Sequence, residues 1–310
     1  MTHQKTLFRM GAFLVALLLI VTARVYAQTT APAPGTATFT VTAVGKKQEA
    51  PPISKDDVQL FQGKERKQIA DWKKGDELFL AILIDSSIDT TAGGQWDYLR
   101  EFILAQPPAT SIALGYLQNN TAMLAQDFTP NHELVTKALR LPLGTSMIGS
   151  SPYLGMIDLL KRWPNTGPRR SILVITSGID WFRGPGSGPI YPDVDPLVQR
   201  AERQNTNIWS IYFPSSGHRG RSFFLTNTAQ NNIDKVSQDT GAESYFLGTN
   251  APVSIKPYLD EISTHLNNQY LLTFAGSGGS KGRFQSVRVR TELPDVEFMS
   301  PSAVFLPPGA

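Results

Sequence analysis

LFLAILIDSSID, residues 78 to 89, is the stretch that decides the fold. Every residue from Leu78 to Ile84 is apolar, and Asp85 ends the run. An apolar run of this length, with a charged segment before it and a Thr/Gly-rich loop after it, predicts a strand that is buried on both faces. Ligands of open α/β sheets bind beyond the carboxyl ends of the strands. Asp85, Ser87 and Asp89 are therefore expected at the binding edge of the sheet.

Predicted strands and helices alternate from this stretch up to Asn268. A second apolar strand is SILVIT, Ser171 to Thr176, and NIWSIYF, Asn207 to Phe213, is the strand after the next helix. Ser151 to Trp163 predicts a helix with Ser151 as its N-cap. The alternation predicts an α/β fold, with a doubly wound and mostly parallel sheet of the Rossmann type.

The two ends of the chain are patterned as β-structure. Thr36 to Val44 reads TATFTVTAV, which alternates with a period of two. Gln269 to Ala275 and Arg283 to Arg290 are two strands joined by GSGGSKG, and this glycine-rich linker predicts a hairpin. We therefore expect small antiparallel additions at both ends of the α/β domain. The expected division of the chain is a signal peptide (1–27), a linker (28–37), an N-terminal β segment (38–77), the α/β domain (78–268) and a C-terminal β segment (269–310).

The first 27 residues are typical of a secretory signal. Lys5 and Arg9 give a positive start, and Gly11 to Val21 is an apolar run shorter than a membrane span. Val25-Tyr26-Ala27 places small residues at the positions that determine cleavage. An uncleaved N-terminal anchor is the alternative. We expect an exported protein, periplasmic or extracellular, with no stable membrane span after cleavage.

The charge balance argues against nucleic acid as a partner. Lys5, Arg9 and Arg24 leave with the signal segment, which has no acidic residue, so 26 of the 29 basic residues remain against 26 acidic ones. Non-specific nucleic-acid binding needs a cationic surface. The chain has no cysteine, which excludes cysteine-based zinc sites and cysteine nucleophiles.

The order and spacing of these features resemble the von Willebrand factor A domain, and more narrowly the VWFA-related proteins exported by Acidobacteria. The resemblance runs from about Thr38 to Leu306. It includes the strand that starts at Asn268-Gln269-Tyr270-Leu271-Leu272 and the late strand Phe284 to Arg290. It implies an A-type fold and a binding or adhesion function toward a protein or peptide, without enzymatic activity.

Many A-type domains carry a metal-ion-dependent adhesion site, and its first element is Asp-x-Ser-x-Ser. Asp85 and Ser87 match the first two positions, and Asp89 replaces the second serine. A hard divalent cation takes such carboxylate and hydroxyl ligands and keeps one position for a partner's carboxylate. The alternative is that Asp85 and Ser87 only cap the loop by bonding its backbone N–H groups.

The later elements of that site match in part. A threonine position falls on Ser150 or Ser151, and Ser177 stands where the family has an aspartate. Asp180 lies three residues further on. The resemblance thus implies a degenerate Mg²⁺ site, whose candidate ligands are Asp85, Ser87, Asp89, Ser151 and Asp180.

Trp181, Phe182 and Arg183 follow the second apolar strand and precede the long loop GPGSGPIYP. Aromatic side chains beside an arginine are typical interface anchors, so these residues are candidates for partner binding. The alternative is that both aromatic rings fold back onto the domain. A second hypothesis is that Arg183, or a cation among His218, Arg219 and Arg221, neutralises Asp85 in place of a metal.

Three functions follow, in order of preference. The first is a binding module, and the second is a metal-independent structural scaffold of an envelope assembly. The third, a hydrolase, lacks a positioned nucleophile and base. The G-x-S-x-G match at 278–282 is flanked by strands on both sides, unlike a nucleophile elbow. His132, His218 and His265 have no metal-ligand spacing among themselves.

Overall fold

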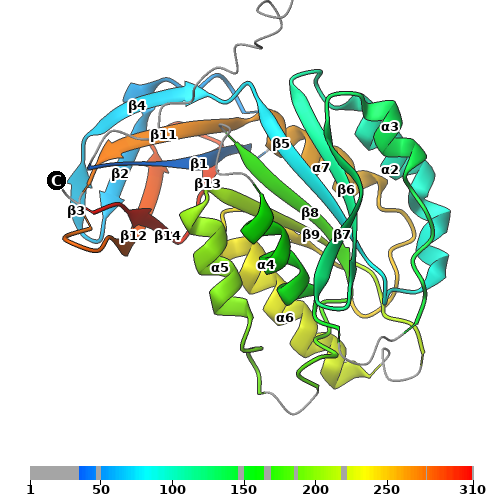
Figure 1. Cartoon of the computed structure of the whole chain (residues 1–310). Coiled ribbons are helices and arrows are strands. Elements are labelled where there is room, and N and C mark those ends of the chain that lie inside the picture. The colour runs from blue at the N-terminus through cyan, green and yellow to red at the C-terminus, as the bar shows by residue number, and fades with distance from the viewer. Residues whose placement is uncertain are drawn as a thin grey trace, which may run out of the picture. The chain divides into compact units, whose positions relative to one another are not determined.

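A computed structural model describes residues 35–46, 50–145, 150–163, 169–184, 188–217, 222–276 and 278–308. The expected signal peptide lies outside these residues. Within them, no helix has the length and apolar character needed to cross a membrane. The largest sheet has the order β10-β9-β8-β5-β6-β7, and only β7 is antiparallel to its neighbour (Figure 1). Its strands are β5 (Leu78–Asp85), β6 (Thr110–Gln118), β7 (Thr121–Thr129), β8 (Arg170–Thr176), β9 (Thr206–Tyr212) and β10 (Ser244–Tyr245).

β5 lies in the middle of this sheet, as its apolar sequence predicts. β6 and β8 pair with it in parallel on its two sides, so that Ile82 lies between Leu114 and Leu173. Every residue from Leu80 to Asp85 is buried. Because Asp85 is the last residue of the strand, its carboxyl group is delivered to the carboxyl edge of the sheet.

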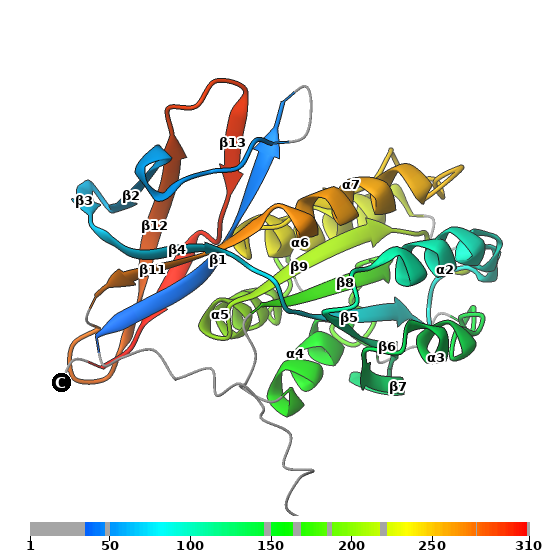
Figure 2. The same ribbon diagram turned by 90° about the horizontal axis from the view of Figure 1, so that it is seen from above.

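Helices cover both faces of the six-stranded sheet, which confirms the predicted α/β arrangement (Figure 2). Successive side chains of a strand point to opposite faces. Leu80, Ile82 and Ile84 pack on one face with α2, α3 and α7. Ala81 and Leu83 pack on the other face with α4, α5 and α6. The helices are α2 (Trp96–Ala105), α3 (His132–Lys137), α4 (Pro152–Arg162), α5 (Val194–Arg203), α6 (Phe223–Asp239) and α7 (Lys256–Asn267), with two 3₁₀ helices, η1 (Lys55–Asp57) and η2 (Thr90–Gln95).

The two ends of the chain interleave in two antiparallel four-stranded sheets, ordered β13-β1-β11-β4 and β14-β12-β2-β3. Thr38 of β1 and Thr273 of β11 are paired and share a hydroxyl hydrogen bond of 2.8 Å. Apolar side chains of both sheets, including Phe39, Leu60 and Phe274, form a separate core. The strands are β1 (Thr36–Gly45), β2 (Val58–Gln62), β3 (Glu65–Lys67), β4 (Ile69–Lys74), β11 (Gln269–Ala275), β12 (Arg283–Thr291), β13 (Val296–Met299) and β14 (Ala303–Leu306).

The hairpin predicted from GSGGSKG is wrong. β11 pairs with β1 and β4, whereas β12 pairs with β2 and β14, so the two strands belong to different sheets. The linker instead lies against the end of β14, where the Gly278 N–H donates to the Pro307 carbonyl at 2.8 Å. The small glycine residues suit this crossing between sheets, because a Cβ on Gly278 would lie 2.3 Å from the Leu306 carbonyl oxygen.

α6 ends at Asp239, and the C-cap residue Thr240 is followed by a glycine. Gly241 has a φ of +75°, which favours glycine. A Cβ there would also lie 2.6 Å from the backbone nitrogen of Pro301. The close approach lets Thr240 form a β-bridge with Pro301, at the entrance to β14.

The end of α5 is bonded to the start of β14. Glu202 accepts hydrogen bonds from the Ala303 N–H at 2.9 Å and the Ser302 hydroxyl at 3.2 Å. The neighbouring Arg203 guanidinium lies 4.0 Å from the centre of the Phe305 ring. Burial raises the pKa of Glu202 to about 7, although both hydrogen bonds oppose the shift. This contact is therefore sensitive to pH near neutrality.

Candidate functional site

Buried polar side chains gather at the carboxyl edge of the six-stranded sheet. Backbone bonds join the loops that carry them: the Phe182 N–H donates to the Ser150 carbonyl at 3.0 Å, and the Ser216 N–H to the Ser87 carbonyl at 3.1 Å. We call this group the edge cluster. Its members are at most 6% exposed, and they are Asp85, Ser86, Ser87, Ser150, Ser151, Thr176, Ser177, Asp180 and Ser215.

Asp85 is held by the turn that follows it and by the last residue of the neighbouring strand β8. One carboxylate oxygen accepts from the Ser87 N–H at 2.9 Å, and the other accepts from the Thr176 hydroxyl at 2.7 Å. Burial raises the pKa of Asp85 above its ordinary value, although these bonds and one from the Ser177 backbone oppose the shift. Asp85 therefore does bond the backbone of its own loop, as the alternative to a metal site predicts. Its carboxylate nevertheless remains among the other polar side chains of the edge cluster.

The hydroxyl groups after Asp85 are poorly satisfied. Ser86 Oγ and Ser87 Oγ are buried, and neither has a well-formed hydrogen bond in the described part of the chain. Ser87 Oγ nevertheless lies close enough to Asp85 to help lower its pKa. The Ser87 carbonyl accepts from the Ser215 hydroxyl at 3.0 Å, which fixes the loop after β9 against this turn.

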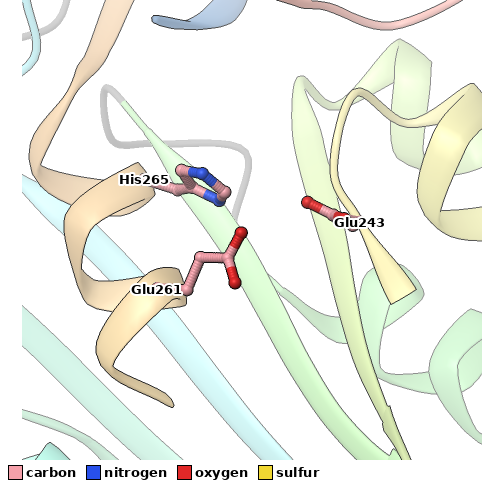
Figure 3. Close-up of side chains that lie close together, drawn as sticks. All are labelled: Glu243, Glu261 and His265. Carbon is pink, nitrogen blue, oxygen red and sulfur yellow. The ribbon is translucent and has the colours of Figure 1, made fainter. Parts of the chain in front are cut away.

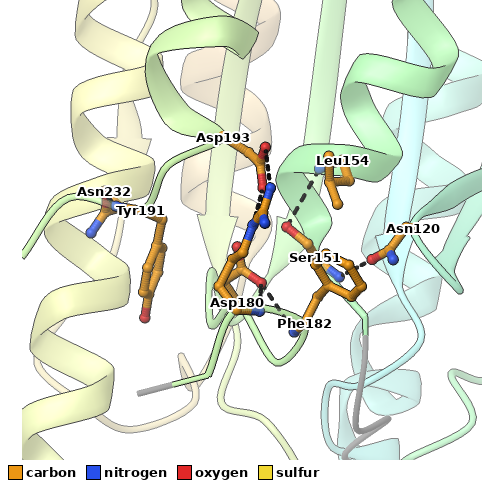
Figure 4. A network of polar contacts seen from close by, with 9 residues as sticks. Asn120, Ser151, Leu154, Asp180, Phe182, Tyr191, Asp193 and Asn232 are labelled. Carbon is orange, nitrogen blue, oxygen red and sulfur yellow. Dashed lines mark hydrogen bonds and ion pairs between the residues drawn. The ribbon is translucent and has the colours of Figure 1, made fainter. Parts of the chain in front are cut away.

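Asp180 is the second buried carboxylate of the edge cluster, at 1% exposure. Its Oδ1 accepts from the N–H groups of Phe182 and Arg183 at 3.0 and 2.9 Å. Oδ2 is buried and has no hydrogen-bond partner among the described residues. Burial raises the pKa of Asp180, against the opposing effect of the Arg183 backbone and the nearby Ser151 hydroxyl. Figure 4 shows Asp180 and Ser151 side by side.

Ser151 caps α4, as predicted. Its Oγ accepts from the Leu154 N–H at 3.4 Å, and its own N–H donates to Asn120 Oδ1 at 2.7 Å. Asn120 is in a left-handed conformation, with a φ of 62°, in the turn between β6 and β7. This turn therefore positions the cap, and with it the hydroxyl that faces Asp180 (Figure 4).

The Asp89 side chain caps a 3₁₀ helix and does not belong to the edge cluster. Its side chain accepts from both the N–H and the hydroxyl of Thr91, at 2.9 and 2.8 Å, and so caps η2. Asp85, Asp89 and Asp180 do not form a group of three carboxylates with oxygens within 4.8 Å of one another. Tyr153 lies near two of them. Burial is the largest cause of the raised pKa of Tyr153, followed by the charges of Tyr191, Asp180 and Asp85.

The donor set suits a hard divalent cation by its chemistry. Neither Asp85 nor Asp180 has an ion pair with a described lysine or arginine, and Asp180 Oδ2 has no well-formed hydrogen bond within the described residues. Carboxylate and hydroxyl oxygens are the ligands that Mg²⁺ prefers. Asp85, Ser87, Ser151 and Asp180 are the predicted ligands that would hold it, whereas the Asp89 side chain is engaged at η2.

The predicted partner-binding residues lie next to this cluster. Phe182 is 47% exposed, and Trp181 is half-buried with an indole N–H that has no partner among the described residues. Arg183 forms a two-pronged ion pair with Asp193, at 3.0 and 3.2 Å. The hypothesis that Arg183 neutralises Asp85 is therefore wrong, because Asp193 takes its guanidinium. His218, Arg219 and Arg221 lie outside the described residues.

Several residues of the site were not predicted. Thr176 ends the predicted strand Ser171 to Thr176, as Asp85 ends its own strand. Their equivalent positions on neighbouring strands could have indicated the hydrogen bond between them. Tyr153 donates to the Gly178 carbonyl at 2.8 Å, beneath the turn that carries Asp180. Asn120 carried no signal, because its contact with Ser151 depends on a left-handed turn residue 31 positions away.

Exposed apolar side chains are concentrated on the same side of the sheet. Among the described residues, twelve large apolar side chains are exposed, and nine lie in the connections that lead into α4, α5, α6 and α7 or in the first turn of α6. Strand-to-helix connections of an open α/β sheet lie at its carboxyl edge. The connection from α3 to α4 also reaches this edge, because the Gly144 N–H donates to the Ser86 carbonyl at 3.1 Å. The nine are Leu141, Leu143, Phe182, Ile190, Phe223, Phe224, Phe246, Leu247 and Val253.

Comparison with known proteins gives structural likenesses only. No protein-family model and no curated protein matches the sequence. Similar solved structures include an aerotolerance-related membrane protein from Bacteroides fragilis (10% identity, TM-score 0.45, 61% of this chain and 98% of that one). Others are the SpRpn10 VWA domain (14%, 0.40, 60% and 95%) and the human COPII-coat protein Sec24c (9%, 0.44, 81% and 46%). At these values the likenesses carry no statement about family or function.

Proposed function

We propose that this protein is an exported, non-enzymatic binding module of the von Willebrand factor A type. It recognises a protein partner at the carboxyl edge of its six-stranded sheet. Numbered along the chain within the sheet, the strand order is 3-2-1-4-5-6, so the first strand, β5, lies where the order reverses. Ligands of doubly wound sheets bind at this reversal point. Export rests on the signal pattern of residues 1–27.

The concentration of exposed apolar side chains is the observation that carries the proposal. Monomeric proteins leave single apolar side chains exposed at random, but a concentration around one edge marks an interaction surface. Phe223 and Phe224 are 75% and 69% exposed, although they begin a helix whose later apolar residues, Ala229, Ile233 and Val236, are buried. The partner is therefore expected to present apolar side chains to this edge.

The edge cluster supplies the polar centre of the proposed surface. In this proposal Asp85, Ser87, Ser151 and Asp180 bind Mg²⁺, and a carboxylate of the partner completes its coordination. Mg²⁺ also neutralises two buried carboxylates, whose raised pKa values reflect the cost of burying their charges.

The chemistry of the edge supports binding rather than catalysis. A hydrolase of the serine type needs a base within hydrogen-bond reach of its nucleophile. Neither described histidine is placed at the edge cluster: His132 contacts the Thr110 carbonyl at 2.8 Å, at the start of β6, and His265 lies near the end of α7.

Retention of partner proteins from the native envelope tests the proposal. The double change Phe182→Ala and Phe224→Ala removes two rings that are 47% and 69% exposed at the edge. Leu104→Ala is the control, because it removes a side chain that is 52% exposed on α2. We expect the double variant to lose the retained partner and the control to keep it. Equal retention by all three proteins would falsify the proposed surface.

A structural scaffold is the second candidate, and one observation favours it. Lys55, Arg66 and Lys67 line a concavity beside β2 and β3, together with Asp56, and Lys67 is ion-paired with Glu65 at 2.8 Å. The excess of basic side chains suits an acidic partner. Changing Arg66 and Lys67 to Ala should abolish assembly if the protein is a scaffold. It should leave partner retention unchanged if the carboxyl edge is the binding surface.

A further inference from the structure

A second group of ligand-type side chains lies away from the edge cluster. Glu243, Glu261 and His265 each offer one atom such that all three atoms lie within 4.8 Å of one another. Figure 3 shows the three side chains pointing toward one another. Glu261 and His265 are four residues apart on α7 and so share a helix face. Glu243 immediately precedes β10, so this group is placed at the amino end of that strand, whereas the edge cluster lies at the carboxyl ends.

His265 is buried in a state suited to metal binding. It is 5% exposed and stacks on Trp209, with ring centres 5.4 Å apart. Burial lowers the pKa of His265, which favours the neutral imidazole with a free lone pair. The one hydrogen bond of its ring among the described residues is to the Tyr245 hydroxyl at 3.5 Å, longer than a normal bond. The ring thus enters the group without a full-strength partner.

The group also has an unbalanced negative charge. Glu243 and Glu261 have no ion pair with a lysine or arginine in the described residues, and the charge of Glu261 adds to burial in raising the pKa of Glu243. The Tyr245 hydroxyl lies close to both Glu243 and His265, but it has one proton and bonds fully to only one of them. A cation bound between the three side chains would balance the charge of the two glutamates and give the His265 ring a partner.

We propose that Glu243, Glu261 and His265 form a binding site for a divalent transition-metal ion, with Zn²⁺ as the best match. One imidazole nitrogen and two carboxylate oxygens are typical zinc ligands, and three protein ligands leave a fourth position for water. Mg²⁺ prefers a set made entirely of oxygens.

The three side chains must move closer together to accept the ion. Ligand atoms that lie 2.0–2.2 Å from a tetrahedral ion are about 3.3–3.6 Å apart. Glu261 is exposed, so a rotation of its side chain closes the remaining gap. Tyr245 then orients the other ligands, as hydrogen-bonded neighbours of metal sites do. The ion joins α7 to the segment before β10, which is a strand of only two residues.

Calorimetric titration of the chelator-treated, full-length protein with Zn²⁺ tests the site. Glu261→Gln removes one ligand from an exposed position, so the variant should fold, and Asp260→Asn removes a charge from the adjacent residue as the matched control. We expect one ion per chain, at least tenfold weaker binding in the Glu261 variant and a change of less than twofold in the Asp260 variant. Zn²⁺ should raise the Tm of wild type and of the Asp260 variant.

Two results overturn the proposal. One is the absence of Zn²⁺ binding by the wild-type protein, and the other is unchanged affinity in the Glu261 variant. Co²⁺ provides a second measurement, because a nitrogen ligand from His265 shifts its visible absorption relative to a site made of oxygens. Asp180→Asn, which changes the edge cluster, should leave Zn²⁺ affinity unchanged. The site at α7 is thereby separated from the proposed Mg²⁺ site.

Discussion

Glu202 gives a quantitative prediction about stability and pH. Its pKa rises from 4.5 to about 7 in the folded protein, mainly through burial. A group whose folded pKa is raised contributes stability that is fully present below the unfolded pKa and is lost as pH rises through the folded pKa. Glu202 should therefore stabilise the junction between α5 and β14 at pH 4.5 and cease to do so above pH 7.

The size of the effect follows from the shift. The change from 4.5 to about 7 corresponds to an upper bound of about 3 kcal/mol, at 1.36 kcal/mol per pKa unit. Partial exposure of the side chain screens its charge, which reduces the expected effect to about 1.5 kcal/mol. Glu202→Gln keeps an acceptor for the Ala303 N–H but carries no charge at any pH. The variant should match wild type near pH 4.5 and exceed its unfolding free energy by about 1.5 kcal/mol at pH 8.

Urea unfolding between pH 4.5 and 8.5, followed by tryptophan fluorescence and circular dichroism, measures this difference. Glu133→Gln is the control, because that glutamate is exposed on α3. The reasoning is refuted if the curves of the Glu202 variant and wild type stay parallel over the whole range. It is also refuted if the variant loses stability relative to wild type as the pH rises.

Three further changes have definite expected outcomes. Asp180→Asn should abolish the stabilisation of the protein by Mg²⁺ in thermal unfolding. Without Mg²⁺ at pH 8 the variant should be at least as stable as wild type, because a buried carboxyl with a raised pKa lowers the stability of the folded protein as the pH rises. Thr176→Val should cost about 2 kcal/mol in urea unfolding by leaving the Asp85 carboxylate short of a donor, and more at pH 8 than at pH 5. Gly241→Ala should cost about 3 kcal/mol through φ and the clash with Pro301, while Gly63→Ala, with a φ of +61° and open space around it, should cost only about 1 kcal/mol. Equal losses in the two glycine variants would show that the close approach to Pro301 is unimportant.

The sequence was most informative where structure depends on neighbouring residues. The apolar run of β5 and the Ser151 cap of α4 are local patterns, and both were predicted with their boundaries nearly as observed. Asp85 and Ser87 were predicted together because one strand end delivers both. Ser151 and Asp180 are grouped, as candidate metal ligands, only through a resemblance, since the two residues come from different loops.

What the sequence did not reveal depends on long-range pairing. The strands on either side of GSGGSKG read as a hairpin, because a local pattern contains no information about strands such as β1 and β2 at the other end of the chain. Glu261 and His265 show helical i, i+4 spacing, which was a usable signal. The third member, Glu243, reaches them only because β10 lies at the edge of the sheet next to α7. Loop placement suggests Arg183 as one of four cations that could neutralise Asp85, but its guanidinium is ion-paired with Asp193.

The pairing of β1 with β11 has a consequence for biogenesis. Ribosomes make the chain from its N-terminus, and the paired residues Thr38 and Thr273 are 235 positions apart. A nascent chain thus holds β1, with Phe39 and Val41, without its hydrogen-bonded neighbour until almost all of the protein has been translated. An unpaired apolar strand is prone to intermolecular association. Premature termination after α7 should consequently yield insoluble product rather than a smaller working domain.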